Sequence, residues 1–115
     1  MLSKELIAAS TRPILLSILE RGENYGYALL QEIEKISAGQ IVWSEGMLYP
    51  VLHRMENEGI IESFWQEAEK GRPRKYYKIT EKARPIIQVE KQQWSTVNQV
   101  LKKLWKPVKP IRNST

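Results

Sequence analysis

The sequence contains no cysteine and no aspartate, and His53 is its only histidine. Without cysteine there are no disulfide bonds and no thiolates to bind a metal ion, and one histidine cannot form an imidazole cluster for zinc or iron. Few groups then remain for acid–base or nucleophilic catalysis. We therefore expect no enzymatic activity, no metal site and no cofactor.

Long apolar runs are missing as well. No stretch is long enough to cross a bilayer, and residues 1–10 lack the apolar segment and small-residue cleavage site of a secretory signal. The basic stretch from Lys102 onward, which includes Trp105, is too short for amphipathic attachment to a membrane surface. We expect a cytoplasmic protein without a membrane partner.

What the chain does contain fits one folded domain. It has 115 residues, of which 42% are hydrophobic and 27% are charged, and its formal net charge is +5. Residues 1–60 carry five Lys or Arg against eight Glu, whereas residues 61–115 carry 13 against five. The second half therefore holds the whole basic excess, and basic clusters of this kind indicate a polyanionic partner.

Apolar residues at helical spacing predict a first helix over residues 10–20, with Ser10 as its cap. Residues 2–9 show a helical pattern too. Pro13 would clash with the carbonyl group of Ala9 if one helix ran through both segments. We therefore expect a bend or break near Pro13.

Two further short helices are predicted before residue 60. The second helix covers residues 25–37, with Asn24 as its cap, and the third begins after a capping Ser44 and ends before Gly59. The spacing of their apolar residues gives each helix one buried face.

The periodicity changes after residue 60. β-Branched and aromatic residues at 60–65 and 75–79 predict two strands, and the polar segment 67–74 between them contains Gly and Pro, as hairpin tips do. Tyr76 and Tyr77 point to opposite faces of the second strand, so we expect one in the core and the other outside.

A final helix is predicted from residue 80 to Trp105. This order of elements is that of a mainly α (α+β) winged helix-turn-helix domain with a two-stranded β-hairpin wing and an added C-terminal dimerisation helix. We assign residues 1–80 to the DNA-binding domain and residues 81–106 to the dimerisation helix. Residues 107–115 are expected to form a disordered basic tail.

Four segments resemble the PadR family of transcriptional regulators and occur in the order found in that family. They are 24–27 (NYGY), 46–56 (GMLYPVLHRME), 58–61 (EGII) and 71–80 (GRPRKYYKIT). Met47 departs from the pattern, because the family usually has Thr or Ser there. The resemblance implies a winged helix-turn-helix regulator that binds DNA as a homodimer.

The third predicted helix has the features of a DNA-recognition helix. Its apolar arc lies opposite Gly46, Pro50 and His53, and the small residues at its start allow close approach to a groove floor. An ordinary solvated face is the alternative, and packing explains Tyr25 equally well. The candidate DNA contacts in and before this helix are Tyr25, Ser44, Gly46, Met47, Tyr49, Pro50, His53 and Arg54.

The predicted hairpin tip is strongly basic. Lys70, Arg72, Arg74 and Lys75 lie close together in the sequence, and no acidic residue interrupts them. A tip of this kind follows a phosphate backbone or enters a minor groove, whereas the alternative is a solvated charged turn. We count these four residues, called the wing cations below, as candidate DNA contacts.

The last predicted helix carries a heptad-like apolar stripe. The residues expected to form a dimer interface are Ile87, Trp94, Val97, Leu101 and Leu104. A helix that folds back on its own core is the alternative. A symmetric pair would place two recognition helices on successive major grooves, about 34 Å apart, and would read an inverted repeat in double-stranded DNA.

Trp94 is bulky for a closely packed helix pair, so the interface is expected to leave a cavity. Short PadR members include multidrug-responsive repressors that stack flat aromatic compounds on a tryptophan of this helix. By that resemblance the candidate effector-binding residues are Trp94, Leu6, Ser17, Lys91, Val97 and Asn98. A plain dimer anchor is an equally good explanation of Trp94.

These observations predict a homodimeric transcriptional repressor that is released from DNA by a small aromatic or amphipathic effector. A winged-helix module that binds other proteins, without specific DNA binding, is the alternative. The two hypotheses differ in whether the wing cations are needed for regulatory activity.

Overall fold

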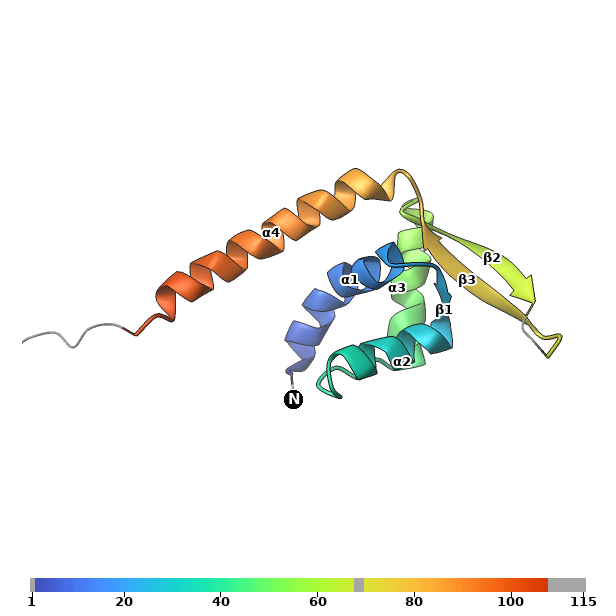
Figure 1. Ribbon diagram of the computed structural model, residues 1–115, viewed down its shortest axis with the longest axis horizontal. Helices are drawn as coiled ribbons and strands as arrows, with labels where there is room; N and C mark the ends of the chain where they lie inside the picture. Colours follow the sequence, from blue (N-terminus) through green and yellow to red (C-terminus); the bar gives the residue numbers. More distant parts are fainter. Residues whose placement is uncertain (1, 68–69, 108–115) are drawn as a thin grey trace, which may run out of the picture.

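The computed structural model describes residues 2–67 and 70–107 (Figure 1). Its elements are α1 (Lys4–Glu20), β1 (Asn24–Tyr25), α2 (Gly26–Ile36), α3 (Glu45–Asn57), β2 (Ile61–Glu67), β3 (Pro73–Ile79) and α4 (Ala83–Leu104). The first three helices form the body. The β2–β3 hairpin projects from one side, and α4 passes over α1 and extends from the other side (Figure 1). The predicted winged helix-turn-helix order is confirmed.

The expected break near Pro13 is wrong, because α1 is one continuous helix. Its cap is Ser3, whose side chain accepts a hydrogen bond from the Leu6 backbone N–H at 3.2 Å, and not Ser10. Proline removes only one donor from the helix, and packing on both sides of it offsets that loss. Thr11 is buried before Pro13 and Leu15 is buried after it. Tertiary packing therefore outweighs the local clash.

Asn24 does not cap the second helix, which corrects a further expectation. Asn24 and Tyr25 form the short strand β1, which pairs antiparallel with Tyr77 and Tyr76 of β3. The sheet therefore has three strands in the order β1-β3-β2 instead of the two predicted. Strand β1 ties the base of the wing to the start of α2.

The predicted cap of the third helix is confirmed, since the Ser44 hydroxyl accepts a hydrogen bond from the Met47 backbone N–H at 3.2 Å. Gly59, with φ of +76°, then lets the chain leave α3 and enter the sheet. One apolar core lies between the three helices and the inner face of the sheet. The core consists of Leu15, Leu16, Ile18, Leu19, Leu29, Ile33, Ile41, Trp43, Leu48, Leu52, Met55, Ile60, Ile61, Tyr77, Ala83 and Ile87.

Helix α4 begins three residues later than predicted. Thr80 instead holds the base of the wing, because its hydroxyl donates to the backbone carbonyl oxygens of Gly59 and Ile60 at 2.7 and 3.1 Å. Only the start of α4 packs on the body, through buried Ala83 and Ile87, and residues 91–100 are all exposed. The helix therefore does not fold back on its own core.

Within residues 2–67 and 70–107, no helix combines the length and the apolar character needed to cross a bilayer. The predicted basic tail lies almost wholly outside the described residues, of which Pro107 is the last.

Candidate nucleic-acid interface

The outward face of α3 has the composition predicted for it. Ser44, Gly46, Pro50, His53 and Arg54 are exposed, while the apolar arc on the opposite side is buried in the core. Gly46 is the second residue of α3, whereas Pro50 is the sixth and lies inside the helix. The small side chains leave the backbone of the first half of α3 accessible to a flat or grooved partner.

Met47 and Tyr49 lie at the edge of this face and are half-buried against the core. The Tyr49 ring leans on the backbone at Gly26, the first residue of α2. A Cβ atom added at Gly26 would lie 2.7 Å from the Tyr49 Cζ atom, which is closer than real contacts allow. Glycine at this position therefore allows α3 and the start of α2 to meet through Tyr49.

The wing cations are exposed, apart from the half-buried Lys75. The Arg74 guanidinium lies 4.4 Å from the centroid of the Tyr25 ring, and the Lys75 ammonium lies 5.7 Å from that of Tyr77. Both are cation–π contacts, which hold the cations in place without neutralising them. Arg74 therefore joins the wing to β1, two elements far apart in the sequence.

A groove of about 350 Å³ connects the body to the wing. Its walls are formed by residues of β1, α2, α3 and β3: Tyr25, Gly26, Tyr27, Tyr49, Arg74, Lys75 and Tyr77. The structure thus brings together Tyr25, Tyr49, Arg74 and Lys75 from the predicted DNA contacts. A second groove, of about 920 Å³, runs along the hairpin between Tyr25 and the tip, with Lys70 and Arg72 among its walls.

The outer face of the sheet carries a row of aromatic rings in which Phe64, for which no role was predicted from the sequence, joins Tyr25 and Tyr76. The Tyr76 ring lies 5.3 Å from the Tyr25 ring, edge to face, and 5.8 Å from the Phe64 ring, stacked. The Lys78 ammonium lies over the Phe64 ring, 5.5 Å from its centroid. Phe64 and Tyr76 are directly opposite each other in the β2–β3 register. Alignment of the two predicted strands would therefore have indicated that Phe64 packs beside Tyr76.

Tyr77 points the other way and is buried, so the predicted alternation of the two tyrosines is confirmed. Burial raises the pKa of the Tyr77 phenol above its ordinary value, and the nearby charges of Tyr49 and Glu56 raise it further. Glu56 itself accepts a hydrogen bond from the Ser63 hydroxyl, which joins α3 to β2.

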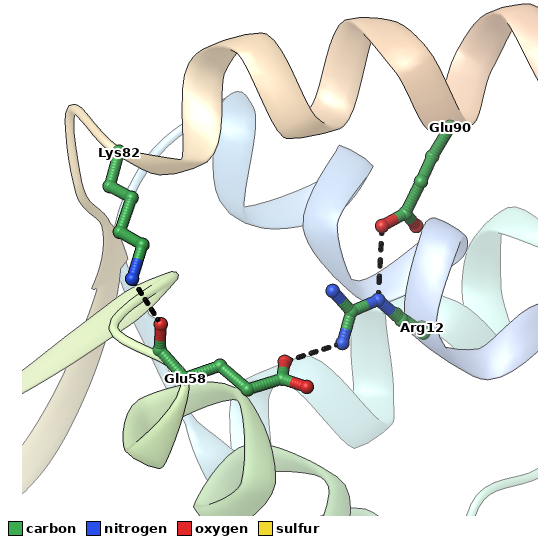
Figure 2. Close-up of polar contacts among 4 residues, drawn as sticks. All are labelled: Arg12, Glu58, Lys82 and Glu90. Carbon is green, nitrogen blue, oxygen red and sulfur yellow. Dashed lines mark hydrogen bonds and ion pairs between the residues drawn. The ribbon is translucent and has the colours of Figure 1, made fainter.

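A charged network at the other end of α3 was also missed (Figure 2). The Arg12 guanidinium of α1 donates to the Glu58 carboxylate at 2.7 Å and to the Glu90 carboxylate of α4 at 3.0 Å. Lys82 donates to the backbone carbonyl of Glu58 at 3.0 Å. Partial burial opposes the charge of Arg12, but the two carboxylates outweigh it and raise the pKa of Arg12.

Four of the six candidate effector residues line two separate hollows. Ser17 and Lys91 line a narrow one of about 20 Å³ between α1 and α4, where Lys91 also pairs with Glu20 at 2.9 Å. Trp94 and Val97 line an apolar one of about 200 Å³ farther along α4. Leu6 and Asn98 are exposed on α1 and α4 and line neither hollow.

Most residues of the predicted dimer interface are accessible. Trp94 is 40% exposed, Val97 52% and Leu104 70%, and Leu101 is half-buried. Ile87 differs from the expectation because it is buried in the core of its own chain. It therefore holds α4 to the body instead of facing a partner.

Comparison with known proteins places these features in one family. The model of the family described as "Transcriptional regulator PadR-like family" matches residues 15–88, which span the core, α3, the wing and the start of α4. The chain belongs to the PadR-like family of transcriptional regulators. The predicted family resemblance is thus confirmed, and this PadR-like chain has the winged-helix fold of that family.

Solved structures agree with this assignment. The chain is similar to a PadR-like transcriptional regulator from Bacillus cereus, with 30% identity, a TM-score of 0.81 and coverage of 91% of this chain and 100% of that one. It is also similar to a transcriptional regulator from Clostridium thermocellum, with 29% identity, a TM-score of 0.82 and coverage of 92% and 100%. Both similarities include α4, which lies mostly beyond the family match.

Among characterised sequences, the chain is 28% identical over 91 residues to transcriptional regulator YqjI from Escherichia coli. That match covers 79% of this chain but only 42% of YqjI. The similarity therefore concerns less than half of the longer protein.

Proposed function

We propose that two copies of this PadR-like chain bind an inverted repeat in double-stranded DNA and repress transcription there. The observation that carries the proposal is the groove that joins Tyr49 of α3 to Arg74 and Lys75 of the wing. Through it, the exposed face of α3 and the wing form one continuous surface. A helix and a cationic hairpin arranged in this way fit a major groove and the adjacent phosphates or minor groove.

The charge distribution supports this surface as the DNA-binding one. The wing carries Lys70, Arg72 and Arg74 with exposed side chains, and Arg54 is exposed on α3. Each cation that contacts a phosphate releases counterions, so binding weakens steeply as salt concentration rises. Glu45 and Glu56 of α3 offset part of the local charge, so we assign affinity mainly to the wing and base recognition mainly to α3.

The uncovered half of α4 supports pairing of two chains. Trp94, Val97, Val100 and Leu104 leave an apolar stripe exposed at successive helical turns. A second α4 related by two-fold symmetry covers such a stripe and turns both recognition helices toward one duplex. We therefore assign residues 1–80 to DNA binding and residues 81–106 to dimerisation.

Selection of bound duplexes from a random pool tests the proposal. Enrichment of an inverted repeat, with affinity that falls as salt rises, is the expected result. The double variant R72Q/R74Q should lower the affinity and reduce the slope of log affinity against log salt by about two. K35Q on α2 is a control for the loss of one exposed cation away from this surface, and it should leave the slope unchanged.

Absence of any enriched duplex, together with unchanged regulatory activity of the double variant, would instead favour a protein-interaction module. The molecular mass in solution tests pairing separately. V97E/L104E, which places charges in the exposed stripe, should yield monomers that no longer select two half-sites.

For the effector, we propose an aromatic or amphipathic molecule that binds at the Trp94 and Val97 hollow within the dimer. The exposed indole and its apolar neighbour offer a stacking surface without a charged group in the hollow. A panel of flat aromatic compounds should quench tryptophan fluorescence in the wild type and much less in W94L. A compound that quenches without changing DNA affinity would show binding without regulation.

A further inference from the structure

The most extensive polar network described in the structure joins three helices at one point. Arg12 of α1 contacts Glu58, the residue that caps the C-terminus of α3, and Glu90, which lies two turns into α4 (Figure 2). Lys82, immediately before α4, holds the same end of α3 through the Glu58 carbonyl oxygen. The end of α3 is thus bound from both α1 and α4.

Arginine at position 12 can bind two carboxylates at once. Its guanidinium presents several N–H groups in a rigid fork, so Nη1 and Nε bind different carboxylates at 2.7 and 3.0 Å at the same time. The side chains of Arg12 and Glu90 are 35% and 20% exposed, so water screens their contact only in part. Ordering the Arg12 side chain costs conformational entropy once, although it forms two ion pairs. The entropic cost per ion pair is therefore lower than for an isolated surface pair.

Beyond this network, little holds α4 to the body. Ala83 and Ile87 are buried, Lys91 pairs with Glu20, and residues 92–100 are exposed. The segment from Glu90 to Leu104 spans about 21 Å at about 1.5 Å per residue. A tilt of about 10° at Glu90 would move the far end of the helix by about 3.5 Å, the length of about one base-pair step.

We propose that Arg12 determines which half-site spacing the dimer accepts, because it fixes the angle between the recognition helix α3 and the dimerisation helix α4. In a symmetric pair joined through the exposed part of α4, that angle sets the separation of the two recognition helices. Arg12 is thus a positioning residue that need not touch DNA. The inference rests on the proposed dimeric, DNA-binding function.

The first test measures binding to inverted repeats with identical half-sites and a spacer that varies by one base pair at a time. The wild type should prefer one spacer. R12Q should reduce that preference by about fivefold, within the range known for groups coupled in one salt-bridge network. R12K, which keeps the charge but loses the fork, should fall between the two.

R84Q is the matched control. Arg84 also pairs with a glutamate, Glu81 at 3.2 Å, but both side chains are largely exposed and the pair does not reach α3. The spacer preference of R84Q should equal that of the wild type. E90Q should reproduce the effect of R12Q, because it removes the α4 partner and leaves Glu58 in place.

The second test needs no DNA. Because the chain has no cysteine, H53C introduces one spin label per chain on α3. In the H53C dimer, the distance between the two labels should have a narrow distribution. When R12Q is added, that distribution should become broader or shift by about 3 Å.

Several outcomes would overturn the inference. If R12Q weakened binding by one common factor at every spacer, Arg12 would have no role in spacing. If the label distances of R12Q coincided with those of the wild type, Arg12 would not fix the angle between α3 and α4. If the wild type shows no label distance and no preference for an inverted repeat, the proposed dimeric function fails, and the role of Arg12 fails with it. A spacer preference in the wild type that survives in R12Q overturns the role of Arg12 alone.

Discussion

The ring of Tyr49 in α3 lies directly on the backbone of Gly26 at the start of α2, with no room for a side chain between them. This contact sets the depth of the groove between the body and the wing, because Gly26 and Tyr49 both line it. A residue with no side chain and a residue with a large one therefore act together on the candidate DNA-binding surface.

G26A should displace Tyr49 and destabilise the fold by about 1–3 kcal/mol, the usual cost of overpacking a close contact. Chemical denaturation measures the change. G46A is the control, because a Cβ atom there meets open space apart from the Ser44 hydroxyl oxygen at 4.0 Å. G46A should keep the stability, and a loss of DNA affinity in that variant alone would indicate close approach of DNA to this end of α3.

R74K should weaken DNA binding by about twofold to fivefold while the salt dependence stays the same. Lysine keeps the charge but cannot stack a planar group on Tyr25. In the wild type the Arg74 guanidinium lies 4.4 Å from the centroid of the Tyr25 ring and so holds the wing against β1. Titration of a selected duplex at several salt concentrations measures both quantities. Y25F should bind nearly as the wild type does, because it keeps the ring. An equal loss in Y25F and R74K would assign the effect to the Tyr25 hydroxyl.

S44A should lower the free energy of unfolding by about 1 kcal/mol, because it removes the hydrogen bond that caps α3. S44D restores an acceptor and should restore the stability. Its negative charge should nevertheless weaken DNA binding, since Ser44 is a candidate DNA contact and DNA is polyanionic. If S44D bound DNA as tightly as the wild type, Ser44 would have only the capping role.

The buried phenol of Tyr77 should make the fold sensitive to alkali. Burial raises the pKa of Tyr77 in the folded state, so the unfolded chain loses this proton first as the pH rises. The stability contributed by the neutral phenol is complete below a pH of about 10 and is lost above it. Urea unfolding between pH 8 and 11 should show a smaller decline for Y77F. Y27F, at an exposed tyrosine, should decline as the wild type does.

The local features of the fold could be predicted from the sequence. The position of Ser44 before an apolar helical pattern predicts its capping role, and the β-branched and aromatic runs on either side of residues 67–74 predict the hairpin. Such signals depend on neighbours in the sequence. The wing cations belong to the same class, because their density is visible without any knowledge of the fold.

Long-range features could not be predicted in this way. Strand β1 is only two residues long and exists because Asn24 and Tyr25 pair with a strand some fifty residues later. Arg12 and Glu90 are 78 residues apart, so no local sequence pattern links them. The continuous helix through Pro13 depends on burial on both sides of it. In each case packing across the molecule outweighs the local pattern.

The exposed far half of α4 should make the stability of the chain depend on its concentration. Because this half gains apolar burial only on association, the proposed dimer should unfold at temperatures that rise with protein concentration. A newly made molecule that has not met another would then keep this half frayed and open to proteases. The amount of protein present would thus govern both how long each molecule survives and how fully its target is occupied.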